Sequence, residues 1–153
     1  MLAFRIADRR HTIFDATGAM LKGARWNSPG KRVIYAAQTF AGAMLEILVH
    51  ANLASIPKTL ASVTISIPAD IAVEALSSTA LLGWDAEDFL TSRSFGDRWL
   101  DQRRTAVLLV PSVVLRGREN NVLLNPEHPG FARIQASAPE PVFWDPRLFS
   151  RTP

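Results

Sequence analysis

The sequence predicts an α+β fold: a single compact domain, residues 1–153, of short strands with a few helices. Its 153 residues fit one domain around one core. A hydrophobic content of 48% and a charged content of 20% are typical of globular proteins. Many short β-type runs accompany only two or three helical segments, which favours α+β over a doubly wound sheet. We find no repeat, low-complexity tract or linker that would divide the chain.

The first 57 residues predict two strands and one helix. Glycines 18 and 23 mark turns in a segment that otherwise has no clear periodicity, and β-branched and aromatic residues centre the second apolar run. The expected elements, in order, are a strand at 2–6, a loop at 11–22, a strand at 31–36, and a helix from Gln38 or Thr39 to about Asn52, with Pro57 ending the region.

Residues 60–67 alternate cleanly between apolar and polar side chains. Val63, Ile65 and Ile67 share one face of the expected strand. Ser62, Thr64 and Ser66 share the other, as in a half-buried strand. Pro68 closes the segment.

The remainder predicts further short strands and two helical pieces. Asp85 is the expected N-cap of a helix start at 85–90, with Asp88 in capping-box spacing, and 96–102 is a second helical piece. The apolar run 105–115 is broken by Pro111-Ser112, which predicts an edge strand or a bulge. Other expected strands lie at 71–76, 122–124, 132–136 and 142–144.

Composition excludes several classes of site. The chain has no cysteine, so it can form neither a disulfide framework nor a thiolate zinc site. Its three histidines are far apart in sequence and do not have metal-ligand spacing, and we expect no metal. A net charge of +3 with scattered arginines suits a phosphorylated small molecule and does not require nucleic acid. Without a signal-peptide pattern or an apolar run long enough to span a membrane, a cytoplasmic protein is expected.

Glu46 is the first candidate for chemistry. It is the only formally charged residue between Val33 and Pro57, and an unpaired buried carboxylate is costly. On a helix it neighbours Gly42 and Ala43, whose small size leaves room for a ligand. The alternative is a solvent-facing glutamate on an amphipathic helix. The main apolar stripe is expected on the opposite side, and comprises Ala37, Phe40, Ala41, Met44, Leu45 and Leu48.

Arg25 is the second candidate, in a polar loop bounded by Gly23 and Gly30. Its guanidinium offers a planar fork of donors for a phosphate or a carboxylate. Trp26 is placed to shield the site or stack on a base, and Asn27 adds hydrogen-bonding groups. The alternative is a surface arginine beside a core tryptophan. The loop is neither a Walker loop nor a GxGxxG turn.

Three more polar or aromatic positions are candidates. Tyr35, at the end of the second strand, can stack on a flat ring or simply pack across strands. Ser112, at the break in an apolar strand, can hold a carboxylate or a ligand, or bond only to the backbone. It has no Gly-x-Ser-x-Gly elbow, so a serine hydrolase is not expected. Asn121 lies in a turn-rich segment whose asparagines either line a site or cap turns.

Together these segments resemble the RES domain, the toxin half of bacterial Xre–RES toxin–antitoxin pairs, a family named for an arginine, a glutamate and a serine. The resemblance covers nearly the whole chain, although the second of two glycines often found before the arginine is here Ala24. The segments that carry it are GARWNSPG (23–30), VIY (33–35), AMLE (43–46), FGDRWL (95–100), VPS (110–112) and NNVLLNPEHP (120–129).

The resemblance implies a fold similar to ADP-ribosyltransferase toxins, with NAD as the substrate rather than a cofactor. RES toxins cleave the bond between nicotinamide and ribose, with water or inorganic phosphate as acceptor, and some relatives instead transfer ADP-ribose to a protein. An Xre-family antitoxin, which binds DNA, would cover the active site, so direct contact of this chain with nucleic acid or membrane is not implied.

The resemblance also assigns roles. Glu46 would stabilise the positive ribose, Arg25 would bind pyrophosphate or phosphate, Tyr35 would stack on nicotinamide, and Ser112 would position Glu46 or the ribose. Substrate-binding roles are expected for Arg5, Trp26, Asn27 and Asn121. A non-enzymatic basic module that binds nucleic acid remains the alternative from another class, and it predicts salt-dependent binding that is indifferent to Glu46.

Overall fold

The structure is a computed structural model and describes residues 1–50 and 58–149. It confirms the α+β class. The strands are β1 (Leu2–Asp8), β2 (Ile34–Ala37), β3 (Leu60–Ser66), β4 (Val73–Ala75), β5 (Val107–Pro111), β6 (Asn120–Leu124), β7 (Gln135–Ala136) and β8 (Glu140–Pro141). The helices are α1 (Thr17–Lys22), α2 (Phe40–His50) and α3 (Leu90–Gln102), with 3-10 turns η1 (Pro129–Arg133) and η2 (Pro146–Leu148).

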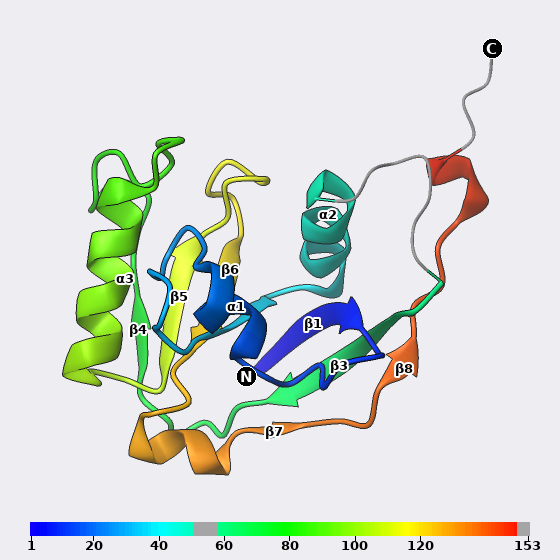
Figure 1. Cartoon of the computed structure of the whole chain (residues 1–153), viewed down its shortest axis with the longest axis horizontal. Helices are drawn as coiled ribbons and strands as arrows, with labels where there is room; N and C mark the ends of the chain where they lie inside the picture. The colour runs from blue at the N-terminus through cyan, green and yellow to red at the C-terminus, as the bar shows by residue number, and fades with distance from the viewer. Residues whose placement is uncertain (51–57, 150–153) are drawn as a thin grey trace.

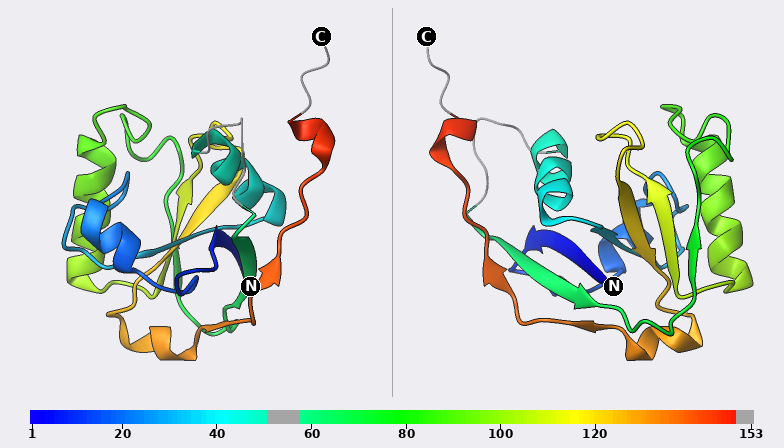
Figure 2. Two further views of the ribbon diagram at one scale, coloured as in Figure 1. Left: turned by 45° about the vertical axis from the view of Figure 1, so that its right-hand side comes forward. Right: turned by 180° about the vertical axis from the view of Figure 1, so that it is seen from behind.

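The strands form one sheet that opens near its middle (Figure 1). Their order is β4-β5-β6-β2-β1-β3-β7, with β8 also paired to β3. Strand β1 pairs with β3 along its whole length, from Leu2 opposite Ser66 to Asp8 opposite Leu60. It meets β2 at one register pair, Phe4 opposite Ala37. The two halves of the sheet therefore splay apart at the β1–β2 junction, as the right-hand view of Figure 2 shows.

Each half of the sheet has its own packing partners. Helix α3 flanks the β4–β5–β6 half (Figure 1), where Trp99 and Leu100 pack with Leu108 and Val110 of β5. Helix α2 stands over the other half and packs on β1 and β2, with Ala43 against Ile6. The junction between the halves thus lies between two helices that do not share a core cluster.

Helix α2 packs on the sheet through its small residues, and the large residues Phe40 and Leu45 of the predicted apolar stripe do not form its packing face. Gly42 and Ala43 are buried, whereas Phe40 and Leu45 are each 38% exposed. Small side chains let the helix backbone approach the sheet closely, which large ones on the same face would prevent. The Glu46 side of the helix consequently faces inward. The helix is described from Phe40 to His50, and its expected end at Asn52, like Pro57, falls outside the described residues.

Two helix predictions are wrong. The expected loop at 11–22 contains α1, with Gly18 inside the helix. The expected helix start at Asp85 is a series of turns, and α3 begins at Leu90 as one helix that includes the piece expected at 96–102. The Asp88 carboxylate does accept a backbone N–H, but from Leu90, two residues on, because Phe89 takes a left-handed backbone there.

The strand predictions place most elements within a few residues, with one error of position in the sheet. The alternation at 60–67 is confirmed by β3, where Val63, Ile65 and Ile67 are buried. β5 is not an edge strand, since it lies between β4 and β6. Pro111 is compatible with that interior place because it is the last residue of the strand. The strand expected at 132–136 is confirmed only at its end, where β7 covers Gln135–Ala136, because its first two residues belong to the turn η1. The strand expected at 142–144 is replaced by β8 at 140–141.

Candidate functional site

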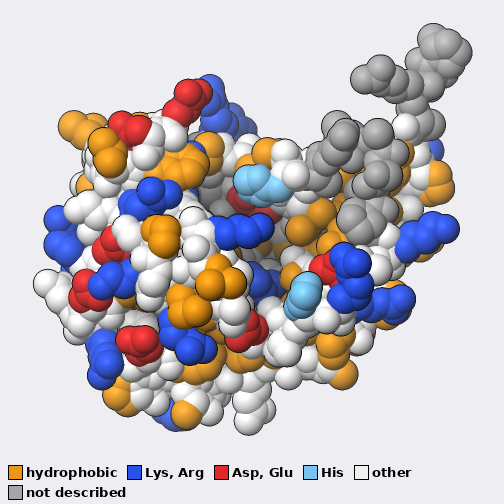
Figure 3. Space-filling model, viewed as in Figure 1, with side chains coloured by type: hydrophobic (Ala, Val, Ile, Leu, Met, Phe, Trp, Pro, Cys, Tyr) orange, Lys and Arg blue, Asp and Glu red, His pale blue; other side chains and the backbone are white. Residues whose placement is uncertain are grey.

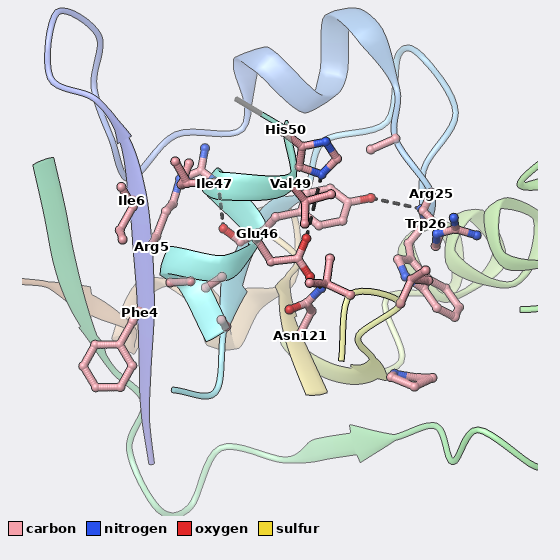
Figure 4. Close-up of a pocket in the computed structure, with 18 of the residues that line it drawn as sticks. Phe4, Arg5, Ile6, Arg25, Trp26, Glu46, Ile47, Val49, His50 and Asn121 are labelled. Atoms are coloured by element: carbon pink, nitrogen blue, oxygen red, sulfur yellow. Dashed lines mark hydrogen bonds and ion pairs between the residues drawn. The ribbon is translucent and has the colours of Figure 1, made fainter. Parts of the chain in front are cut away.

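A cavity of about 600 Å³ opens where the sheet splays. Its walls come from β1, the loop after α1, β2, the inward face of α2, Phe89 and the ends of β5 and β6. Figure 3 shows the hollow on the face that carries His side chains and several arginines. Polar side chains from four separate segments line it: Arg5, Arg25, Glu46, His50 and Asn121. Figure 4 shows Glu46, His50 and Asn121 together, with Arg5 on one side of them and Arg25 on the other.

Glu46 is the only acid among the described residues that line this cavity. Its Oε1 accepts hydrogen bonds from the Ser112 hydroxyl at 2.9 Å and from the Asn121 amide at 2.8 Å. The Glu46 side chain is 26% exposed, so it reaches both the protein donors and the cavity. Two neutral donors fix one oxygen of the carboxylate and leave its negative charge in place.

The start of α2 is tied to the strand that carries Asn121. The Thr39 hydroxyl accepts the N–H of Gly42 at 2.9 Å and donates to Glu119 Oε2 at 2.7 Å. The backbone N–H of Gln38 donates to the carbonyl of Asn120 at 3.2 Å. These bonds set the register between α2 and β6, which is what brings Glu46 to Asn121.

Arg5 spans the opening in the sheet. From β1 its Nη1 donates to the carbonyl of Tyr35 on β2, and its Nε donates to the carbonyl of Ile13, both at 2.6 Å. Burial lowers the pKa of this guanidinium, and Asp15 opposes that shift. It forms no ion pair with a residue in the described ranges. A buried, unpaired cation on a cavity wall favours an anionic ligand.

Arg25 faces the cavity from the opposite side (Figure 4). Its Nη1 donates to the carbonyls of Trp84 at 3.2 Å and Ala86 at 2.8 Å, and its guanidinium carbon lies 4.3 Å from the centroid of the Phe89 ring. Desolvation lowers the pKa of Arg25, with Asp85 and Glu46 acting against it. The site therefore holds two guanidinium groups with the Glu46 carboxylate between them.

Tyr35 presents its ring to the cavity and its hydroxyl to the Arg25 loop. The hydroxyl donates to Asn27 Oδ1 at 2.8 Å and accepts the N–H of Trp26 at 3.1 Å. Burial raises the pKa of the Tyr35 phenol, so it stays protonated. The two hydrogen bonds thus fix the ring through its hydroxyl group. The part of the ring that lines the cavity remains available to a ligand.

Asn27 does not lie on the cavity, which corrects its expected role in substrate binding. It is fully buried, and its amide donates to the carbonyls of Ala19, Ser28 and Lys31. Trp26 lines the cavity but is 2% exposed and packs edge-on against Phe95. Asn27 and Trp26 both stabilise the loop that carries Arg25. Their positions in the sequence beside Arg25 did not distinguish this structural role from a role in ligand binding.

The loop at 23–30 is also held from α3. Ser28 donates its N–H and its hydroxyl to the Asp97 carboxylate at 2.8 and 2.5 Å. Gly96 packs so closely on the loop that a Cβ there would lie 1.9 Å from the carbonyl oxygen of Trp26. Gly23 itself has φ +67 and no room for a side chain beside Pro29.

Sequence reasoning did not assign His50 or Phe89, which line the cavity, to the site. His50 lies one turn after Glu46, with its Nε2 3.8 Å from Glu46 Oε2, and the i, i+4 spacing was a signal that could have identified it. Phe89 has no such signal, because it comes from a distant turn. Within residues 1–50 and 58–149, no group of three or more His, Asp or Glu side chains is placed to hold a metal ion. No helix in those ranges is long and apolar enough to cross a membrane.

Comparison with known proteins places this arrangement in a family. Residues 2–145 match the RES domain. The chain belongs to the RES domain family. A relative from Sphingobium sp. named Prs ADP-ribosylating toxin is 39% identical over 141 residues, which are 90% of this chain and 87% of that protein. A protein named Toxin Res from Pseudomonas putida is 35% identical over 153 residues, 97% of this chain and all of that one.

A solved structure shares the fold. The crystal structure of the M. tuberculosis MbcT–MbcA toxin–antitoxin complex contains a chain that matches 97% of this RES chain with a TM-score of 0.75. The match covers 86% of that chain at 21% sequence identity. The likeness confirms the α+β architecture expected from the sequence.

Proposed function

We propose that this RES chain is the toxin of a toxin–antitoxin pair and that, in the cytoplasm, it cleaves the nicotinamide–ribose bond of NAD, with water or phosphate as acceptor. The observation that carries the proposal is a single carboxylate, Glu46, fixed by Ser112 and Asn121 in a cavity that has a guanidinium on each side. The names of the curated relatives support the toxin assignment.

The chemistry of the bond suits a site with one acid. When the bond between nicotinamide and ribose breaks, positive charge develops at the anomeric carbon, as in other glycoside cleavages. A carboxylate beside that carbon stabilises the transition state more than the ground state. Nicotinamide leaves as a neutral ring and takes up the bonding electron pair at its nitrogen, so departure needs no general acid. We assign the carboxylate role to Glu46 and the stacking on nicotinamide to the ring of Tyr35, both of which line the cavity.

The two guanidinium groups suit the rest of the substrate. NAD carries a diphosphate, and Arg5 and Arg25 are the cavity cations without a carboxylate partner among the described residues. We assign Arg25 to the diphosphate or to an acceptor phosphate and Arg5 to a second phosphate contact. We assign Asn121, whose amide donates to Glu46 Oε1, to the ribose side of the site.

The test is incubation of the purified chain with NAD, with and without inorganic phosphate, and separation of the products by mass. We expect free nicotinamide from the wild type and none from Glu46→Gln, which keeps the shape and removes the charge. Glu140→Gln, on the exposed strand β8, is the matched control and should retain activity. ADP-ribose or its phosphorylated form would identify the acceptor. Folded wild-type protein that releases no nicotinamide would overturn the proposal.

The name of the Sphingobium relative favours a second candidate, transfer of ADP-ribose to a protein. Both reactions need the same cleavage at the same carboxylate and differ in the acceptor. The experiment is incubation with NAD labelled in the adenylate and a bacterial lysate. Label on a protein band that depends on Glu46 would support transfer, and label only in free ADP-ribose would support hydrolysis.

We further propose an Xre-family antitoxin as the partner, seated over the cavity mouth. The solved structure that shares the fold of this RES chain is a toxin–antitoxin complex, which supports a partner of this kind. Co-purification of the chain with the product of an adjacent gene, and loss of nicotinamide release in the complex, would support this. Full activity in the complex would contradict it.

A further inference from the structure

Phe89 combines backbone strain with a place on the cavity wall. It precedes α3 with φ +61, the left-handed region that is unfavourable for a bulky residue. Such a conformation persists only where the surroundings fix it, and it is frequent at functional sites. The ring of Phe89 lines the cavity, where the guanidinium of Arg25 lies against it.

Arg25 is held by the same short turn that carries this ring. Its Nη1 donates to the carbonyls of Trp84 and Ala86, and Phe89 follows three residues after Ala86. No carboxylate in the described part of the chain forms an ion pair with Arg25. Carbonyl dipoles and a π face orient a cation without neutralising it. A carboxylate would compete with an incoming phosphate for the same donors.

A second arginine reinforces the contact. The guanidinium carbon of Arg93 lies 5.5 Å from the Phe89 ring centroid, and its Nε donates to the carbonyl of Ala24 at 3.1 Å. Arg93 therefore joins the residue before Arg25 to the ring that packs on Arg25. The ring cannot move into solvent without loss of contacts to both guanidinium groups.

We propose that Phe89 is a positioning residue for Arg25. With the two carbonyls of its turn, the ring holds the guanidinium unpaired at the cavity wall, so that the remaining N–H donors bind the diphosphate of the substrate. The identity of that anion rests on the proposed function, whereas the orientation of Arg25 does not. Phe89 acts through Arg25 and has no part in bond cleavage.

Binding of inorganic pyrophosphate to the purified full chain, measured by calorimetry, tests this without any turnover. Phe89→Asn tolerates the left-handed backbone and removes the ring. We expect it to weaken pyrophosphate binding about tenfold. Phe89→Tyr keeps the ring and should bind within about twofold of the wild type. With NAD as substrate, Phe89→Asn should raise KM more than it lowers kcat. If Phe89→Asn does not fold, Phe89→Gly, which suits the same backbone, replaces it.

A double-mutant cycle shows whether the effect passes through Arg25. Arg25→Lys keeps a positive charge and loses the planar fork. In that background, we expect Phe89→Asn to cause no further loss. An equal loss in both backgrounds, or unchanged binding by Phe89→Asn alone, would overturn the proposal. A folded wild type that does not bind pyrophosphate would also overturn it. Pyrophosphate binding without nicotinamide release would instead overturn NAD cleavage and leave the role of Phe89 standing.

Discussion

The hydroxyl of Ser112 donates to Glu46 Oε1 at 2.9 Å, although 66 residues separate the two in sequence. The same hydroxyl accepts the N–H of Leu115 at 3.3 Å, which fixes the direction of its proton toward the carboxylate. Ser112 is 1% exposed and does not line the cavity. It is placed to orient Glu46 rather than to contact the substrate.

Ser112→Ala should therefore lower nicotinamide release without unfolding the chain. A hydrogen bond to a charged group is worth about 1.5–3 kcal/mol, so kcat/KM should fall about tenfold to hundredfold. The measurement is steady-state nicotinamide release. Ser66→Ala, an exposed serine on β3, is the control and should keep full activity. Equal activity of all three proteins would remove Ser112 from the site.

Asn121→Asp should make nicotinamide release fall as the pH rises. The substitution keeps the shape but places a second carboxylate where the amide now lies 2.8 Å from Glu46 Oε1. Like charges this close share a proton, so the pKa of the pair rises. We expect nicotinamide release to be nearly lost at alkaline pH and partly regained as pH falls, when one proton restores a donor to the remaining carboxylate.

Rate against pH for the Asn121→Asp variant measures this directly. Asn120→Asp introduces the same charge at the adjacent residue, whose amide donates to Gln38 rather than to Glu46. It should follow the wild-type profile. Parallel profiles for both variants would contradict the contact between Asn121 and Glu46.

Gly96→Ala should destabilise the protein although alanine favours helices. The new Cβ would lie 1.9 Å from the carbonyl oxygen of Trp26, so α3 or the Arg25 loop must move. Overpacking of this kind costs about 1–3 kcal/mol, more than the gain of about 1 kcal/mol in helix propensity. Urea unfolding measures the difference. Gly18→Ala is the matched control, since no atom lies within 4 Å of its Cβ position, and it should not destabilise.

Tyr35→Phe should destabilise the protein at neutral pH, and the stability difference from the wild type should shrink at alkaline pH. The hydroxyl makes two hydrogen bonds to the Arg25 loop, worth about 1 kcal/mol each. Burial raises the folded-state pKa of Tyr35 above its ordinary value of 10.0. Above that value the unfolded chain loses the proton and the folded chain keeps it, so the free energy of unfolding falls as pH rises.

Urea unfolding of the wild type and Tyr35→Phe between neutral pH and about pH 11 tests the sign. Tyr35 is the only tyrosine of the chain, so tyrosinate absorbance reports its ionisation directly. A stability difference that stays constant across this range would contradict the buried phenol.

Local patterns determined much of the fold. The alternation at 60–67 predicted β3 because strand periodicity is a property of neighbouring residues. The isolation of Glu46 in an apolar segment marked it as a residue that needs partners. The α+β class followed from the number and length of such segments. The short helix α1 was missed because its glycine and brevity give no clear period.

Only the tertiary structure decided which residues meet. Ser112 and Asn121 reach Glu46 through the pairing of β5 with β6 and of β6 with β2, contacts between segments far apart in the chain. The packing of α2 on β1 and β2 buries its small residues and leaves Phe40 and Leu45 of the expected stripe partly exposed. Packing between other distant segments buries Asn27 and brings Phe89 to Arg25. Periodicity records what each segment prefers by itself, whereas the site is made by close packing between segments, which no local pattern encodes.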